Sequence, residues 1–181
     1  MSERKGDWAQ TYTGKQFWPL DPRAEDIDLK DISHGLANLC RFNGHCKSFY
    51  SVAQHSVLVS KMVSQEQKLA ALFHDASESY TGDLIGPLKR SLPPEFKQIE
   101  LRIEGLIYQT LGITNVNHDE IKLADRRALV TEMRDVMGRP PAKWNEDGLF
   151  EPHPAKIIPL MPNEAEQAFL ERYEKLRQRQ K

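Results

Sequence analysis

Residues 69–84 read LAALFHDASESYTGDL, and this stretch decides how the rest of the chain folds. Its first five residues are apolar on every side, which is typical of a helix that is buried all round. We expect one helix to run from Glu66 to about Tyr80 and to end at Gly82, because glycine is the common residue at a helix C-terminus. The pattern predicts a helical core.

One imidazole and two carboxylates interrupt this apolar run. Adjacent residues on a helix point about 100° apart, so His74 and Asp75 can flank one site. Glu78 follows three residues after Asp75 and shares its side of the helix. Buried carboxylates are costly unless they are paired or bind a metal, and a divalent cation is a natural compensating charge. A lone buried histidine is more often a core residue, but three such groups on one face favour a site.

The surrounding sequence is also predominantly helical, and no segment alternates as a strand would. Residues 1–30 look irregular, and the segment 139–162 holds six of the eleven prolines and should cross the surface as a loop or lid. The chain is therefore expected to be one all-α domain. Caps, apolar periodicity and glycine stops predict further helices at Asp31–Phe42, Ser51–Val63, Glu95–Leu111, Asn117–Met137 and from Asn163 onward, the last with Ala165, Phe169, Tyr173 and Leu176 inward.

Two residues on other predicted helices extend the candidate site. His55 lies on an apolar helix face, where it is either a satisfied core histidine or a metal ligand. Asp125 shares the inward side of its helix and either binds metal or pairs with a nearby basic residue. Glu132, seven residues after Asp125, could lie above it and support the ligands. Two imidazoles and two carboxylates from three helices would suit a divalent metal with open positions for water.

Composition narrows the classes of function. The 181 residues include 25 Lys and Arg against 26 Asp and Glu, a formal net charge of −1. Binding to nucleic acid or to an acidic membrane needs a basic excess, so neither class is favoured. No apolar run is long enough for a membrane span, and residues 1–6 lack the apolar core of a secretion signal. Cys40 and Cys46 match neither a disulfide framework nor a zinc pattern, so we expect a reducing, cytoplasmic compartment.

The segment FHDASESYTGDL at 73–84, with Gln54-His55-Ser56 before it and Ala124-Asp125 after it, resembles the HD-domain phosphohydrolase superfamily. The resemblance is to the bacterial 5′-deoxynucleotidases and the phage dNTP triphosphohydrolases, and it covers about residues 31–135. It implies an HD-type helical bundle, a single domain over residues 1–181 and a homo-oligomer. It implies one divalent transition metal (Mn, Co, Zn or Fe), with a second Mg or Mn ion able to arrive with the substrate, and as ligands His55, His74, Asp75 and Asp125.

The same resemblance assigns substrate contacts. Arg41 matches a position that contacts phosphate or base, and Phe42 one that stacks on the base, although a core aromatic is the simpler interpretation of Phe42. Lys89 matches a basic position near the phosphates, with a solvated surface lysine as the alternative. His45 either reaches the phosphates or is a loop residue without a role. Asp83 matches an aspartate near the nucleotide sugar.

The favoured function is a metal-dependent nucleotide phosphohydrolase. In this hypothesis Glu78 activates or orients the attacking water, and the substrate is a deoxyribonucleoside 5′-monophosphate. A triphosphohydrolase that releases triphosphate from a dNTP such as dATP fits the motif as well, because the metal chemistry is the same. A non-catalytic nucleotide-sensing module is the alternative from another class. A (p)ppGpp hydrolase is disfavoured because Ser79 follows Glu78, where that subset carries a second acid.

Overall fold

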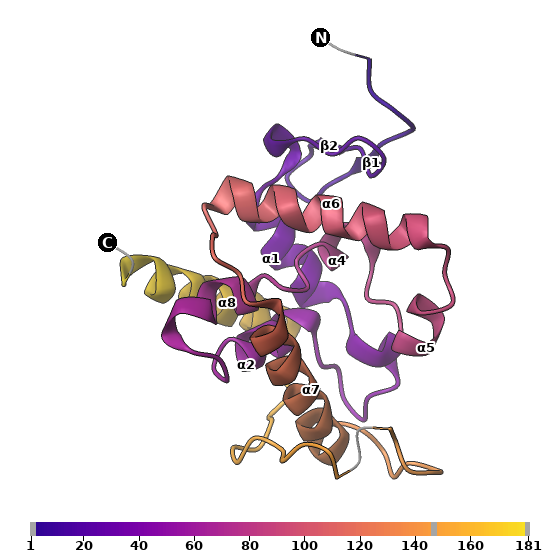
Figure 1. The fold of residues 1–181 in the computed structure, drawn as a ribbon, viewed down its shortest axis with the longest axis vertical. Coiled ribbons are helices and arrows are strands. Elements are labelled where there is room, and N and C mark those ends of the chain that lie inside the picture. Colours follow the sequence, from indigo (N-terminus) through magenta and orange to yellow (C-terminus); the bar gives the residue numbers. More distant parts are fainter. Residues whose placement is uncertain (1–2, 146–147, 180–181) are drawn as a thin grey trace.

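The computed structural model describes residues 3–145 and 148–179, and these residues are predominantly helical, which confirms the predicted all-α class (Figure 1). One small antiparallel hairpin pairs strand β1 (Ala9–Gln10) with β2 (Gln16–Phe17). Three 3-10 helices are η1 (Ala24–Asp26), η2 (Arg41–Gly44) and η3 (Gln65–Gln67). The α-helices of the described residues are α1 (Leu29–Asn38), α2 (Val52–Val59), α3 (Lys68–Leu72), α4 (Glu78–Thr81), α5 (Gly86–Lys89), α6 (Pro94–Leu111), α7 (His118–Asp135) and α8 (Pro162–Gln178).

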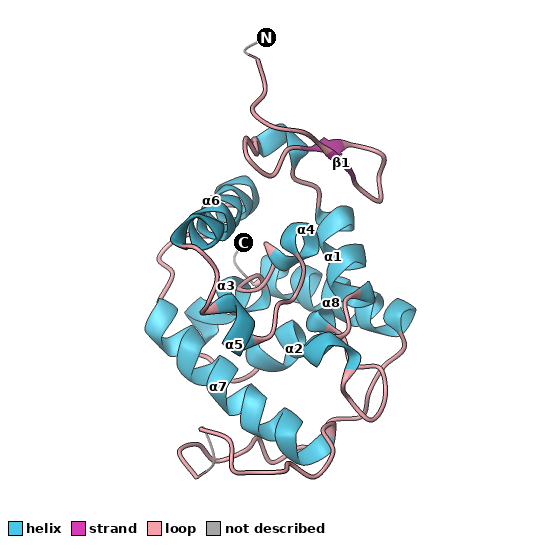
Figure 2. Ribbon diagram, turned by 90° about the vertical axis from the view of Figure 1, so that its right-hand side faces the viewer, coloured by secondary structure: helices cyan, strands magenta, loops and turns pink. Residues whose placement is uncertain are grey.

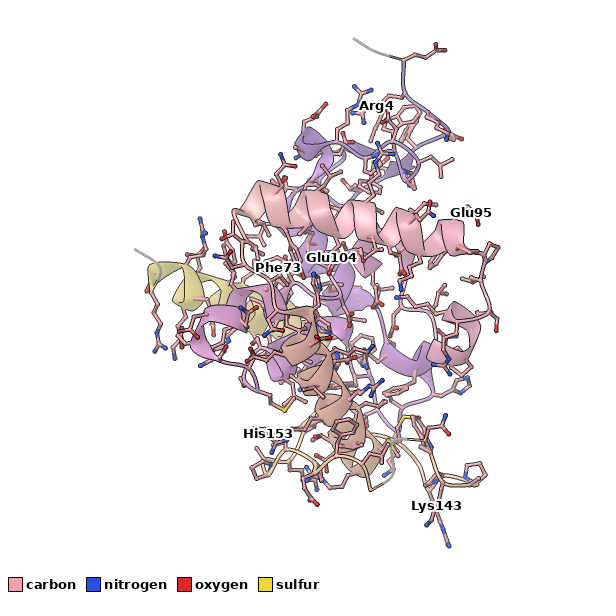
Figure 3. All side chains as sticks on the ribbon, viewed as in Figure 1. Arg4, Phe73, Glu95, Glu104, Lys143 and His153 are labelled. Atoms are coloured by element: carbon pink, nitrogen blue, oxygen red, sulfur yellow. The ribbon has the colours of Figure 1, made fainter. Side chains whose placement is uncertain are left out.

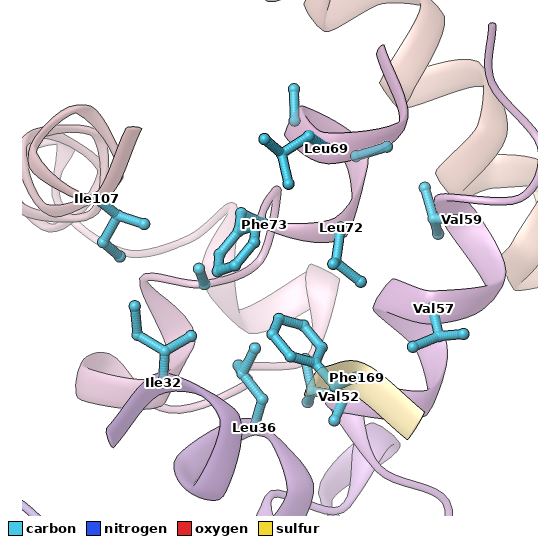
Figure 4. Close-up of a cluster of buried hydrophobic side chains, with 14 of the residues drawn as sticks. Ile32, Leu36, Val52, Val57, Val59, Leu69, Leu72, Phe73, Ile107 and Phe169 are labelled. Atoms are coloured by element: carbon cyan, nitrogen blue, oxygen red, sulfur yellow. The ribbon is translucent and has the colours of Figure 1, made fainter. Parts of the chain in front are cut away.

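The core lies where α1, α2, α3 and α8 meet (Figure 4). Phe73 is fully buried there and packs edge-on against Phe169 of α8, with ring centroids 5.2 Å apart. Ile103 and Ile107 of α6 join the same core. On α8, Ala165, Phe169 and Leu176 are buried and Tyr173 is partly buried, as the sequence predicts. No helix in the described ranges is both long and apolar enough to cross a membrane.

The helix predicted from Glu66 to Tyr80 is wrong, because the structure divides it. The segment α3 ends at Leu72, and residues 73–77 form tight turns before α4 begins. Nδ1 of His74 bonds to the carbonyl of Ala71 at 2.8 Å. A continuing α-helix would give that carbonyl to the backbone N–H of Asp75. The imidazole therefore occupies a carbonyl that the helix would otherwise use, and this helps to end the helix just before His74 and Asp75.

The predicted boundaries of the first two long helices also need correction. Asp28, not Asp31, caps α1, since its side chain accepts from the N–H of Lys30. Asp31 instead accepts both the N–H and the hydroxyl of Thr13, at 2.7 and 2.9 Å. The helix stops at Asn38 rather than Phe42, because the next residues pair with the start of α2 through a bridge between Cys40 and Ser51. Ser51 does cap α2, which ends at Val59 rather than Val63.

The described parts of the two segments expected to be irregular, residues 1–30 and 139–162, pack against the helices at opposite ends of the molecule (Figure 2). At the N-terminal end, Phe17 stacks on Tyr80 of α4 with ring centroids 3.9 Å apart, and Asp21 accepts from Arg102 of α6. At the other end, the described residues between α7 and α8 form neither helix nor strand. Gln54 of α2 binds this crossing at two points, donating to the carbonyl of Ile158 at 2.7 Å and accepting from the N–H of Leu160 at 2.9 Å.

Helices α1 and α4 touch at a glycine. A Cβ atom placed on Gly35 would lie 2.9 Å from Cβ of Ser79 and 3.2 Å from its carbonyl oxygen. Heavy atoms this close cannot coexist, so α4 can approach α1 at this distance only because residue 35 has no side chain. The contact fixes α4, and therefore Glu78 at its start, against the first helix.

Candidate metal centre

His55 is delivered to the centre of the molecule by α2. Ser51 caps that helix, and the flanking Val52 and Val59 are fully buried. The imidazole is itself fully buried, and its Nδ1–H donates to Oε1 of Glu132 at 2.6 Å. This bond commits Nδ1, so the other nitrogen, Nε2, faces the cluster described next.

His74 presents the same nitrogen from the opposite side. Its Nδ1–H is committed to the carbonyl of Ala71, which leaves Nε2 directed at Nε2 of His55, 3.3 Å away. When both imidazoles are neutral, their Nδ1 protons are committed and each Nε2 carries a lone pair. The two Nε2 atoms can share a metal ion, and this is the arrangement that orients histidine ligands in metal sites.

Two carboxylates complete the cluster. Oδ1 of Asp125, from α7, lies 3.2 Å from Nε2 of His55, and Oδ2 of Asp75 lies 3.4 Å from the same atom and 3.2 Å from Nε2 of His74. His55, His74 and Asp125 each offer a ligand atom within 4.8 Å of the others, so the chain has a possible metal-binding group. Asp75 adjoins this group through both imidazoles. All four predicted ligands therefore lie together.

The charges in this cluster favour a cation. Burial opposes the charged form of His55, but Glu132 and the two aspartates outweigh it and raise the pKa of this imidazole well above its ordinary value. Burial likewise opposes the charge on His74, and Asp75 raises its pKa. The imidazoles in turn hold the pKa of Asp75 and Asp125 low, against the effect of burial. A metal that binds Nε2 of these imidazoles therefore competes with protons.

Arg41 and Glu132 support the cluster from behind. Glu132 is fully buried on α7 and accepts from Nη2 of Arg41 at 3.1 Å as well as from His55. Nη1 of the same guanidinium lies 3.8 Å from Oδ2 of Asp75. Arg41 thus lies beside the ligand cluster, where its guanidinium pairs with the carboxylates of Glu132 and Asp75. Glu132 was expected above Asp125, whereas its bonds in the structure are to His55 and Arg41.

A small cavity opens beside the ligands. It encloses about 160 Å³. Glu78 lines it and is buried; its Oε1 lies 3.1 Å from Nζ of Lys89, whereas its Oε2 is buried without a hydrogen-bond partner. Burial and the charges of Asp75 and Asp83 raise the pKa of Glu78 well above its ordinary value. The cavity is lined by His74, Asp75, Ser77, Glu78 and Lys89, and from α6 by Lys97, Glu100, Leu101 and Glu104.

Three further residues that the sequence placed at the site are Asp83, Phe42 and His45. Asp83 is half-buried in the loop after α4, and burial raises its pKa against the effect of Arg41. Phe42 is half-buried, lies 5.2 Å from the guanidinium of Arg41 and packs edge-on against Trp144. Its φ of 55° is left-handed, a costly conformation for a residue with a side chain. His45 is exposed and is not part of the ligand cluster of the described residues.

The acidic face of α6 was not anticipated. Glu100 is buried, and Oε1 of this residue lies 2.8 Å from Nζ of Lys89. Glu104, one turn later, accepts from the hydroxyl of Tyr108 at 3.0 Å. A signal was present in the sequence, since Glu100 is three residues before Ile103 and seven before Ile107, both inward-facing. A carboxylate at that spacing is predicted to face inward with them.

Comparison with known proteins shows the family. No family model matches the chain. It is 40% identical over 168 residues to Uncharacterized protein YfdR of Escherichia coli (strain K12), an alignment that covers 92% of this chain and 94% of that protein. The chain belongs to the YfdR family. A second relative of this YfdR-family chain, an uncharacterized protein of Rhodobacter capsulatus, is 34% identical over 133 residues, which is 68% of each chain.

Proposed function

We propose that this protein is a metal-dependent phosphohydrolase of the HD type that removes phosphate from deoxyribonucleoside 5′-monophosphates. The observation that carries the proposal is the pair of Nε2 atoms 3.3 Å apart, each on an imidazole whose Nδ1 is committed elsewhere. Nucleotide as the substrate rests on the resemblance of residues 73–84 to the deoxynucleotidase signature.

The donor set fits a divalent transition metal. Ligand atoms that share one ion at about 2.1 Å lie roughly 3.0–3.4 Å from each other in octahedral or tetrahedral geometry. The separations of 3.2–3.4 Å between the imidazole nitrogens and the carboxylate oxygens fall in that range. His55, His74, Asp75 and Asp125 would hold the ion. Such an ion supplies Lewis acidity and lowers the pKa of water that binds to it.

The other residues of the site would bind the phosphate and move a proton. Glu78 has one oxygen engaged by Lys89 and one unpartnered, and its raised pKa makes it a stronger proton acceptor than an ordinary carboxylate. Lys89 and Arg41 bring positive charge to the two sides of Asp75 and Glu78, where phosphoryl oxygens would need it. The cavity of about 160 Å³ is smaller than a pocket for a whole ligand. It suits the phosphoryl end of a monoester.

Hydrolysis assays with defined metals test the proposal. The protein is stripped with EDTA, reloaded with Mn²⁺, Co²⁺ or Zn²⁺, and mixed separately with the deoxynucleoside monophosphates and triphosphates. Release of orthophosphate and nucleoside from monophosphates supports the proposal. Release of triphosphate from dNTPs instead would favour the triphosphohydrolase, and hydrolysis of neither would leave the nucleotide-sensing module.

Variants connect the activity to the site. Asp125→Ala removes a ligand and should abolish both metal retention and hydrolysis. Asp119→Asn is the matched control, because Asp119 is an exposed aspartate in the first turn of the same helix. Glu78→Ala should retain metal and lower kcat. Full activity with stoichiometric metal in Asp125→Ala would contradict the ligand assignment.

A further inference from the structure

We infer that Glu100 is a positioning residue that holds Lys89 against Glu78 and so aims the free oxygen of Glu78 into the cavity. The inference rests on the proposed function and adds to it a component on α6. It is carried by one line of contacts from Glu100 through Lys89 to Glu78.

Lys89 is bound by two carboxylates from different elements. Its ammonium donates a hydrogen bond to Oε1 of Glu78 at 3.1 Å and forms an ion pair with Oε1 of Glu100 at 2.8 Å, a close contact without the alignment of a hydrogen bond. The lysine side chain is about one-third exposed, and a flexible stem of this length would move to solvent if it were held at one point only. Both acids are buried, at 8% and 5% exposure. Their charge outweighs the effect of burial and raises the pKa of Lys89, which keeps it charged.

Glu100 has a rigid base. It lies on α6, and Ile103 and Ile107 anchor that helix in the core with no exposed surface. Because the helix is fixed, the carboxylate of Glu100 is fixed, and the ammonium of Lys89 is fixed with it. The residue does not need to touch a substrate in order to act.

The consequence appears at Glu78. Lys89 engages Oε1 and leaves Oε2 buried, without a partner, in a residue that lines the cavity. A buried oxygen without a partner is unfavourable unless a ligand or water completes it. With one oxygen tethered, the carboxylate has a defined direction. Without Glu100, Lys89 would have one carboxylate partner and Glu78 would be free to turn.

The test uses Glu100→Gln, which keeps the shape and removes the charge. Glu95→Gln is the control, because Glu95 is an exposed acid near the start of the same helix. Glu104 of this helix is unsuitable as a control, because its side chain points toward the interior (Figure 3). With Mn²⁺-loaded protein and a deoxynucleoside monophosphate, Glu100→Gln should lower kcat about tenfold and leave KM and metal content within about twofold. Glu95→Gln should match the wild type in all three.

A double-mutant comparison separates positioning from general damage. If Glu100 acts through Lys89, adding Glu100→Gln to Lys89→Met should lower kcat no further than Lys89→Met alone. Full multiplication of the two effects would overturn the inference. So would a loss of metal in Glu100→Gln, because the effect would then arise at the ligands. Thermal melting confirms that each variant is folded, and Glu100→Asp, which restores the charge, should recover part of the rate.

A second measurement needs no activity. Acetylation of Lys89 by acetic anhydride, followed by mass spectrometry of the peptide, should be at least about threefold faster in Glu100→Gln than in wild type, because the ammonium loses a partner and its pKa falls. Glu95→Gln should not change this rate. If the wild-type protein hydrolyses no phosphate ester, the proposed function fails. The acetylation rate of Lys89 would still test whether Glu100 holds Lys89. An unchanged acetylation rate in Glu100→Gln would overturn the inference even in an active enzyme.

Discussion

Nδ1 of His55 donates to Oε1 of Glu132 at 2.6 Å, and neither side chain has any exposed surface. The bond links α2 to α7, which also carries Asp125. It therefore orients a histidine ligand and joins the two helices that supply ligands to the same group. The positive charges of Arg41 and His55 keep the pKa of Glu132 low despite its burial, so the acceptor stays ionised.

The first prediction concerns this acceptor. Glu132→Gln keeps the size of the side chain but removes the charge that binds Nδ1 of His55, and metal affinity should fall about 10- to 100-fold. Titration with a metal-binding fluorescent competitor measures the affinity. The control is Glu164→Gln, an exposed acid at the start of α8. Unchanged affinity in Glu132→Gln would show that the charge of Glu132 does not support metal binding through His55.

The second prediction is a pH dependence of metal binding. The pKa values of His55 and His74 are both raised, so protons compete with the metal for these imidazoles. Metal affinity should therefore rise as pH rises and should fall as the imidazoles become protonated. Calorimetry in two buffers of different ionisation enthalpy should show that metal binding releases protons. No proton release would mean that the imidazoles are already neutral in the metal-free protein.

The third prediction concerns the contact between α1 and α4. Gly35→Ala forces a methyl group against Ser79, and overpacking of this kind costs about 1–3 kcal/mol. Alanine is the better helix former by about 1 kcal/mol, which offsets part of that cost. We expect a net fall in the free energy of unfolding, measured by urea denaturation. Gly105→Ala on α6 meets nothing within 4 Å and should instead stabilise the protein. Equal effects of the two substitutions would show that the approach at Gly35 is not tight.

The fourth prediction concerns the thiol of Cys46. Burial raises its pKa to about 11, and Sγ donates to the carbonyl of Arg41. At pH 8.5 the thiolate fraction should be about a hundredfold lower than in an ordinary cysteine. Alkylation with iodoacetamide, followed by peptide mass spectrometry, should therefore be slow in the folded protein and fast in urea. Rapid alkylation of the folded protein would contradict the raised pKa of this thiol.

The sequence was sufficient for the residues whose side chains must face a helical core. Apolar periodicity located α6, α7 and α8 closely, and the positions of His55, His74, Asp75 and Asp125 on inward faces predicted that they would meet. It failed where side chains compete with the helix for hydrogen bonds. The imidazole of His74 hydrogen-bonds to the carbonyl of Ala71, and helix propensities of single residues do not account for such a bond. Likewise, the ion pair between Lys89 and Glu100 joins two helices across the cavity, and only the folded chain shows it.

The N-terminal residues lie outside the stretch that resembles the HD superfamily, yet they are built into the framework of the site. Phe17 is buried against Tyr80, Thr13 binds Asp31, and Arg102 of α6 reaches back to Asp21. Residues 31–135 are therefore not a portable module. Trimming the chain to residues 31–135 would remove Phe17 from Tyr80 on one side and Phe169 from Phe73 on the other. The boundaries of the sequence motif and the boundaries of the folded unit differ in this protein, and a transplanted site would have to carry both flanks with it.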